Sequence, residues 1–83
     1  MELQTKLPVK YGIGTEFVPR IERSFYPEKK YTPDECAYAD VIYDREGIIL
    51  YVLLKKNDPE YEVTIAEKII DDFYVPLTKE TTI

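Results

Sequence analysis

The side chains that could do chemistry in this sequence are mostly carboxylates, because its 83 residues include sixteen Asp and Glu but no histidine. Without histidine, Ser-His and Cys-His nucleophilic pairs and imidazole metal ligands are all excluded. Cys36 is the only cysteine, so an intramolecular disulfide and a multi-cysteine zinc site are excluded as well. We interpret Cys36 as a small residue at the start of a strand. These residue types predict a protein that is not an enzyme and needs no cofactor.

Two groups of closely spaced acids could hold Ca²⁺. Asp58, Glu60 and Glu62 form one group, and Asp71 and Asp72 form the other. Neither group has the spacing of an EF-hand loop, and sixteen acids in a short chain produce such pairs by chance. We therefore expect no metal site. Three glycines are also too few for a loop that cradles phosphate.

Charge is distributed unevenly along the chain, whose formal net charge is −5. Residues 1–30 carry four acids and six bases (+2), whereas residues 31–83 carry twelve acids and five bases (−7). An acidic domain is a poor general ligand for nucleic acid, because phosphate binding rests on Lys and Arg. It suits a basic partner, although the same charge also keeps a small protein soluble. Strand alternation and the turn that follows predict an acidic face for partner binding, made of Asp40, Asp44, Glu60, Glu62, Glu67, Asp71 and Asp72.

The segment from Ser24 to Glu35 is the longest irregular stretch, and it is the second candidate binding site. Loops of about twelve residues without regular structure are uncommon in compact domains and are often functional. The candidate contact residues of this aromatic loop are Phe25, Tyr26 and Tyr31. A structural alternative is that Phe25 and Tyr31 cap one end of the fold. Nearby cations also leave open the binding of a nucleic-acid strand, through Arg20, Arg23, Lys29 and Lys30.

Three apolar runs separated by two turn signals predict an antiparallel meander from Ala37 to Ala66. The middle run, Ile48–Leu54, is apolar on both faces, so we expect it to be central and covered on both sides. An alternative is a helix over Pro33–Ile42, since the four residues from Thr32 to Glu35 resemble a capping box. The weak helix formers that follow favour at most one helical turn there.

Outside the meander we expect a first strand over Glu16–Arg23, with Phe17 and Ile21 facing inward. Pro19 places this strand at an edge of the sheet, or its own backbone nitrogen on an unpaired side. Glu67–Asp72 is expected to form a 3₁₀ turn, because it is short for a helix of its own. A last strand over Phe73–Leu77 follows. Residues 1–10 and 78–83 are expected to be flexible tails of a single domain that spans residues 1–83.

Five short strands, a long loop after the first and a 3₁₀ turn before the last predict a mainly β fold, a small five-stranded antiparallel SH3-like barrel. The sequence also resembles the small SH3-like proteins of phages and prophages. The resemblance lies in Tyr11-Gly12-Ile13-Gly14, in Tyr61-Glu62-Val63, and in the run from Asp71 to Glu80. It implies this fold and an origin in a mobile element, but no activity.

The function that these features predict is that of a small, acidic, non-catalytic protein-binding module. The expected partner is a basic host protein, such as a nuclease complex, and phage-encoded anti-CRISPR and other anti-defence inhibitors are proteins of this class. The alternatives are a nucleic-acid-binding SH3-like barrel and a structural or assembly protein of a phage. We expect a cytoplasmic protein that does not engage membranes, since the first ten residues contain no signal-like run and the longest apolar run is seven residues.

Overall fold

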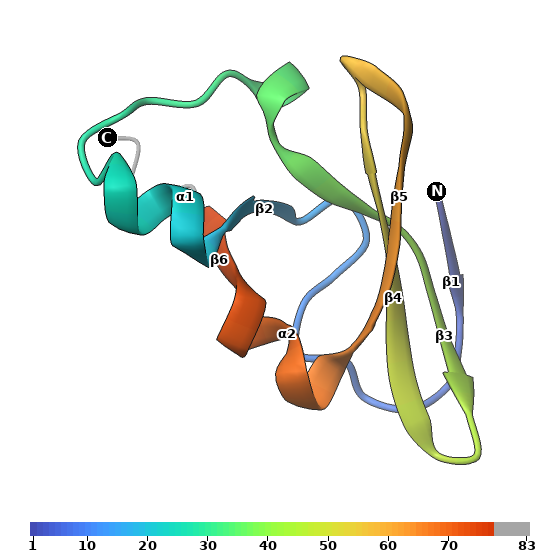
Figure 1. The fold of residues 1–83 in the computed structure, drawn as a ribbon. Coiled ribbons are helices and arrows are strands. Elements are labelled where there is room, and N and C mark those ends of the chain that lie inside the picture. Colours follow the sequence, from blue (N-terminus) through green and yellow to red (C-terminus); the bar gives the residue numbers. More distant parts are fainter. Residues whose placement is uncertain (78–83) are drawn as a thin grey trace.

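The computed structural model describes residues 1–77, which form a curved, mainly antiparallel sheet with two short helices beside it (Figure 1). The strands are β1 (Glu2–Gln4), β2 (Glu16–Pro19), β3 (Ala37–Arg45), β4 (Ile48–Lys55), β5 (Asp58–Ala66) and β6 (Tyr74–Leu77). The helices are α1 (Arg20–Phe25) and α2 (Glu67–Phe73), and a single 3₁₀ turn, η1, spans Pro33–Glu35. The mainly β class predicted from the sequence is confirmed.

Over residues 1–77 the sheet has six strands rather than the predicted five, and it is not closed. Its order is β5-β4-β3-β2-β6, and β1 is added parallel to the second half of β3. The two end strands do not pair with each other within residues 1–77, because α2 lies between them in the chain and leads β6 away from β5. β5 and β6 are linked instead by their side chains, since the hydroxyls of Tyr61 and Tyr74 lie 2.6 Å apart.

The predicted meander is confirmed. β3, β4 and β5 follow one another as antiparallel hairpins, with Ile42 opposite Tyr51 and Tyr51 opposite Ile65. Glu46 and Gly47 join β3 to β4 with φ of 54° and 82°, and two positive φ values are the geometry of a type I′ hairpin turn. β3 begins at Ala37, so the alternative helix to Ile42 is wrong and only η1 is helical. Glu35 accepts a hydrogen bond from the Thr32 N–H across that turn, at 3.1 Å.

The expectation that both faces of the middle strand are covered is wrong for one face. Ile49, Tyr51 and Leu53 are buried, whereas Leu50, Val52 and Leu54 are only half-buried. These three outer side chains are partly shielded from water without a second layer of structure, because apolar side chains of the neighbouring strand β3 lie beside them. The register places Tyr43, Val41 and Tyr38 opposite them in that order.

The first predicted strand is too long. β2 ends at Pro19 and α1 begins at Arg20, so Ile21 is exposed rather than inward-facing. Proline cannot donate to a strand ladder, and Pro19 has φ −53°, which allows the chain to turn into a helix. The Arg20 guanidinium fixes this turn by donating to the carbonyl oxygen of Asp71 at 2.8 Å. Phe17 is fully buried, as predicted.

The segment after the meander is an α-helix, not the predicted 3₁₀ turn. α2 covers the inner face of the sheet with Ile70, which is completely buried in the core. This tertiary contact stabilises a helix that is too short to form alone. Phe73 is the last residue of α2, so the final strand begins one residue later than predicted, at Tyr74.

The first predicted tail, residues 1–10, is not wholly a tail, because Glu2–Gln4 forms β1, which pairs in parallel with Val41–Tyr43. The second, residues 78–83, lies outside the described residues. Between them the core joins the inner faces of the central strands to α2 and to Phe17, and the Tyr11 ring meets the Phe17 ring edge-on at a centroid distance of 5.2 Å.

Candidate functional site

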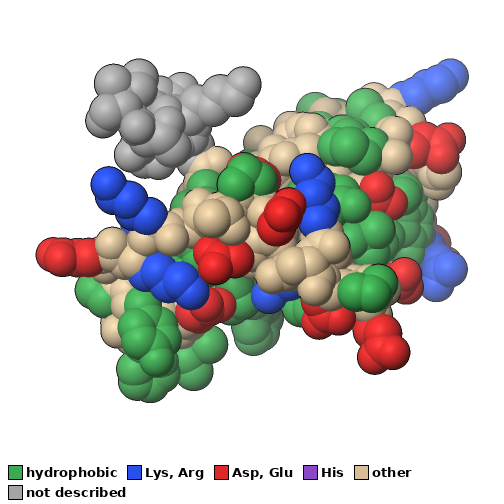
Figure 2. All heavy atoms as spheres, turned by 90° about the horizontal axis from the view of Figure 1, so that it is seen from above, with side chains coloured by type: hydrophobic (Ala, Val, Ile, Leu, Met, Phe, Trp, Pro, Cys, Tyr) green, Lys and Arg blue, Asp and Glu red, His purple; other side chains and the backbone are tan. Residues whose placement is uncertain are grey.

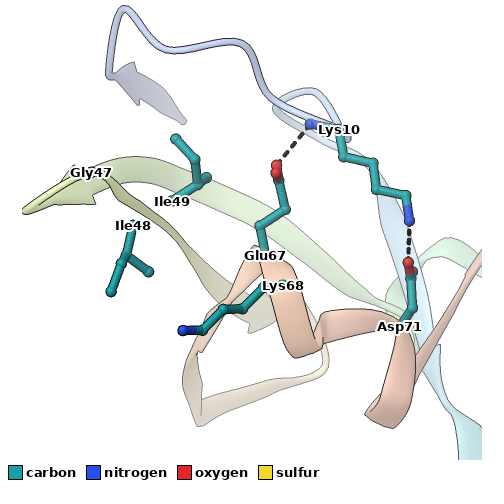
Figure 3. Close-up of a pocket in the computed structure, with 7 residues that line it drawn as sticks. All are labelled: Lys10, Gly47, Ile48, Ile49, Glu67, Lys68 and Asp71. Carbon is teal, nitrogen blue, oxygen red and sulfur yellow. Dashed lines mark hydrogen bonds and ion pairs between the residues drawn. The ribbon is translucent and has the colours of Figure 1, made fainter.

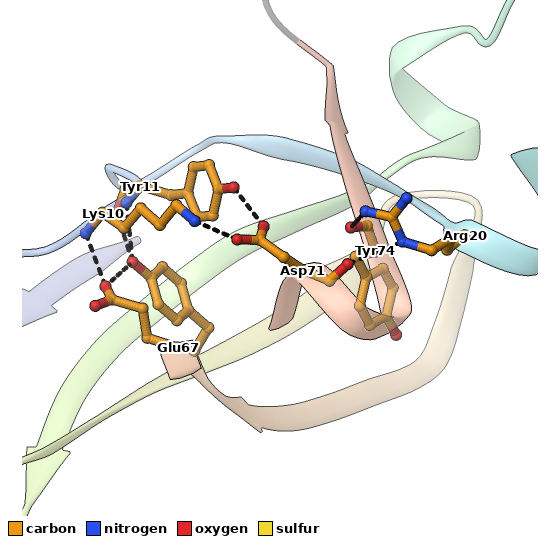
Figure 4. Close-up of polar contacts among 7 residues, drawn as sticks. Lys10, Tyr11, Arg20, Glu67, Asp71 and Tyr74 are labelled. Carbon is orange, nitrogen blue, oxygen red and sulfur yellow. Dashed lines mark hydrogen bonds and ion pairs between the residues drawn. The ribbon is translucent and has the colours of Figure 1, made fainter. Parts of the chain in front are cut away.

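Two of the predicted acidic-face residues, Glu67 and Asp71, lie one helical turn apart on α2 and hold the N-terminal segment against the core (Figure 4). Glu67 Oε2 accepts hydrogen bonds from the Lys10 backbone N–H and from the Tyr51 hydroxyl, both at 2.7 Å. Asp71 Oδ1 accepts from the Tyr11 hydroxyl at 2.5 Å, and Asp71 Oδ2 forms an ion pair with the Lys10 ammonium group. We call these five residues the clasp.

The electrostatics of the clasp favour the ionised form of Asp71 and the protonated forms of Lys10 and Tyr51. Hydrogen bonds from Lys10 and then from Tyr11 hold the pKa of Asp71 below its usual value, and the same bond to Asp71 raises the pKa of Lys10. Burial, followed by the bond to Glu67, raises the pKa of Tyr51. Glu67 Oε2 and both carboxylate oxygens of Asp71 therefore have internal partners, and the clasp stabilises the fold rather than presenting a free acidic surface.

The two predicted acids on β3 do not point the same way. The pairing of β3 with β4 shifts register at Asp40, between Ala39 and Val41. Such a bulge inserts one residue and breaks the alternation that the prediction assumed. Asp44 consequently shares the side of buried Ile42, although it lies exposed at the end of β3, whereas Asp40 lies 3.5 Å from the N-terminal ammonium group.

Glu60 and Glu62 are the two predicted acids that the structure brings together. Both are exposed, and the residues between and after them, Tyr61 and Val63, pack against the core. Glu60, Glu62 and Thr64 thus share the outer side of β5, as strand alternation predicts.

The remaining acids lie elsewhere, so the seven residues do not form one face. Glu62 is opposite Leu54 and Asp44 is opposite Ile49, which separates the two carboxylates by about 17 Å along β4 at 3.4 Å per residue. Asp72 is exposed on α2.

The predicted aromatic loop is divided between a helix and a connection. Phe25 is the last residue of α1 and Tyr26 follows it, and both side chains are exposed. Tyr31 is half-buried, and the Lys29 ammonium group lies 4.8 Å from the centre of its ring. The idea that Phe25 caps one end of the fold is therefore wrong, whereas the partial burial of Tyr31 fits that alternative.

Sequence reasoning missed an apolar patch on the two helices, because it assigned Ile21 to the inner side of a strand. Ile21 and Phe25 lie one turn apart on α1, Ile69 and Phe73 lie one turn apart on α2, and the two helices contact each other. Figure 2 shows hydrophobic side chains projecting at the end of the molecule that carries α1. The apolar patch consists of Ile21, Phe25, Tyr26, Ile69 and Phe73, all of which are exposed. The i, i+4 spacing of both pairs was the available signal.

Three of the four cations proposed for nucleic-acid binding make internal contacts. Arg20 donates to the Asp71 carbonyl, and Arg23 donates to the Lys29 carbonyl at 3.1 Å. The Lys29 ammonium group lies 3.8 Å from the Glu22 carboxylate as well as over Tyr31. These contacts reduce the charge that this segment can offer to phosphates.

A hollow of about 340 Å³ lies between residue 10, the β3–β4 turn and α2 (Figure 3). Its lining residues are Lys10, Gly47, Ile48, Ile49, Glu67, Lys68 and Asp71. Three of its four charged side chains belong to the clasp, so their hydrogen-bonding groups face internal partners. Over residues 1–77, no group of three acidic or cysteine side chains is arranged to hold a metal ion, and no helix is long and apolar enough to cross a membrane.

Within residues 1–77, two of the surfaces that present accessible groups are the apolar patch and the outer side of β5 with Glu60 and Glu62. Their assignment rests on the geometry of this chain, because comparison with protein-family models, with curated proteins and with solved structures finds no match.

Proposed function

We propose that this protein is a non-catalytic protein-binding module that attaches to a basic partner protein. The observation that carries this proposal is the apolar patch, where Ile21, Phe25 and Phe73 are 71%, 72% and 58% exposed. Large apolar side chains gathered on a protein surface mark interaction sites, and aromatic residues are enriched in protein interfaces. Placing them in contact with a partner removes from water apolar side chains that are exposed on the described part of the chain.

The chemistry of the partner follows from charge. The chain has a net charge of −5, and the exposed carboxylates of Glu60, Glu62 and Asp72 attract basic surfaces and accelerate encounter. In its narrower form, the proposal is that the protein covers the basic channel of a nucleic-acid-handling host protein, such as a nuclease complex, in the cytoplasm. Support for this form comes from the acidity of the chain, because a negatively charged surface complements a channel lined with Lys and Arg.

The test is affinity capture from extracts of the native host with two matched variants. Phe25→Ser combined with Phe73→Ser removes two of the five apolar side chains of the patch, one from each helix, whereas Leu3→Ser combined with Leu7→Ser removes two exposed apolar side chains elsewhere. We expect the parent and the control variant to capture the same partner. The patch variant should capture roughly tenfold less of it, or none. Tyr26→Ala should weaken binding of the same partner while leaving the melting temperature of the protein nearly unchanged.

The purified partner then allows the electrostatic part to be measured. Association should be fast at low salt and should slow steeply toward about 1 M salt, where the screening length is about 3 Å. Equal capture by both double variants would remove the patch from the interface. Salt-sensitive binding of plain single-stranded DNA or RNA, with no protein captured, would replace the proposal with the nucleic-acid-binding alternative.

A further inference from the structure

β5 has an open edge of unusual length. Among the described residues, 1–77, it pairs with β4 alone and ends the strand order. It is nine residues long, whereas β6 at the other end has four residues and contains Pro76. An unpaired strand edge presents backbone N–H and C=O groups that another strand can use. Pro59 interrupts the edge only near its start, and residues 60–66 contain neither proline, glycine nor lysine. The register with β4 shifts between Asp58 and Glu62, so the regular part of the edge runs over the five residues from Glu62 to Ala66, and Glu60 lies just before it.

The side chains of this edge have two different chemistries. Glu60, Glu62 and Thr64 are exposed on the outer side, whereas Tyr61 and Val63 are half-buried and Ile65 is buried on the inner side. A strand added beside β5 would place its own side chains within about 5 Å of these residues on the same two sides. Lys or Arg would pair with the carboxylates, and β-branched residues would extend the cover over Tyr61 and Val63.

A second copy of this chain fits the edge poorly. In an antiparallel β5–β5 pair that keeps the inner sides of both copies on one side of the ribbon, Glu62 can lie opposite itself or opposite Glu60. Both registers gather four carboxylates on the other side, and like charges across strands are destabilising. The acidic residues thus act against self-association and in favour of a basic strand.

We propose that the β5 edge binds an extended segment of a partner protein by strand addition, with Lys or Arg at alternate positions beside Glu60 and Glu62 and β-branched residues between them. This inference rests on the proposed protein-binding function and specifies its ligand. The β5 edge is distinct from the apolar patch. An experiment can therefore disprove the binding role of one surface without disproving that of the other.

The experiment uses the full chain and two synthetic peptides of about seven residues, in which lysine alternates with valine. One has an ordinary backbone, and the other is N-methylated at every second residue so that it keeps its charge but loses the edge hydrogen bonds. Affinity is measured by fluorescence anisotropy, and amide hydrogen exchange locates the site. We expect the ordinary peptide to bind and to slow exchange in β5, and the methylated peptide to bind roughly tenfold more weakly or worse.

Charge-matched variants separate strand addition from general attraction. Glu60→Lys with Glu62→Lys should abolish binding, whereas Glu28→Lys with Glu46→Lys makes the same change at exposed sites outside β5 and should retain most of it. Thermal melts establish that all variants fold.

The inference is overturned by equal affinity for the two peptides, by equal losses in the two double variants, or by a parent chain that sediments as a dimer through β5. If neither peptide binds but the patch-dependent partner is still captured, the strand-addition inference fails and the proposed function stands.

Discussion

Removing a single oxygen from the clasp, by Tyr51→Phe, should destabilise the fold strongly. Tyr51 is completely buried, and its hydroxyl donates to Glu67 Oε2 at 2.7 Å and accepts from the Tyr11 N–H at 3.0 Å. Phenylalanine has the same ring, so no large cavity forms and the change isolates the hydroxyl. A hydrogen bond to a charged group contributes about 1.5–3 kcal/mol. Tyr11 is half-buried, so water can accept part of the hydrogen bond that its N–H loses. We therefore expect the free energy of unfolding to fall by about 2–3 kcal/mol.

This loss is large for a chain of this size. A domain of 83 residues is stable by about 4–12 kcal/mol at 0.05–0.15 kcal/mol per residue. At 4–8 °C per kcal/mol, the Tm should fall by roughly 8–24 °C. The measurement is a thermal and urea melt followed by circular dichroism, with Tyr43→Phe as the control. The Tyr43 side chain is half-buried on the outer face of the sheet, and its change should stay within about 0.5 kcal/mol.

A double-mutant cycle with Glu67→Gln tests the assigned partner. Because the two side chains share a hydrogen bond, the combined loss should be smaller than the sum of the single losses by about 0.5 kcal/mol or more. Additive losses, or a Tyr51→Phe melt that matches the control, would show that the clasp contributes little to stability and would refute the reasoning.

Three further perturbations test the fold. Gly47→Val should cost about 1–2 kcal/mol in a urea melt, because φ is 82° and the added Cβ meets no atom within 4 Å, so the cost is backbone strain alone; an unchanged melt would contradict that turn geometry. Leu50→Pro should cost roughly 3 kcal/mol or more by deleting an N–H from an internal strand, and a cooperative melt near the parent Tm would place β4 outside the sheet. Stability should be lost as pH falls through the lowered pKa of Asp71, below 3.8, and as pH rises through the raised pKa of Lys10, above 10.5. Acid titration of Asp71→Asn should lack the first of these losses, and identical acid curves for the variant and the parent would exclude Asp71 as its source.

The meander could be predicted from the sequence because its determinants are local. Apolar runs of strand length and a glycine-containing turn specify two hairpins without reference to the rest of the chain. α1 was missed because Pro19 was interpreted as an edge-strand residue, although proline also ends a strand and precedes a helix. α2 was missed because the burial of Ile70, which stabilises so short a helix, depends on residues far away in the sequence.

The candidate site was harder to predict than the fold. The prediction of an acidic face requires uninterrupted alternation of side chains along β3. The inserted residue at Asp40 reverses the side of the sheet on which Asp44 lies. Nothing in the local sequence marks that bulge. Glu67 and Asp71 were correctly placed after the meander, but their partners at residues 10 and 11 lie about sixty positions away, and sequence spacing does not indicate which carboxylates are occupied internally.

The same separation along the chain governs how this protein folds and how long it stays folded. The meander joins neighbouring segments, whereas the clasp and the β2–β6 pairing, with Glu16 opposite Leu77, close loops that span most of the chain. Loops of that length are costly to close, so hairpin formation is expected to precede them and the transition state to contain little of the clasp. Weakening the clasp should then accelerate unfolding while leaving the folding rate nearly unchanged. The lifetime of the native state, and with it the resistance of the N-terminal segment to proteases, would be set by five side chains outside the folding nucleus.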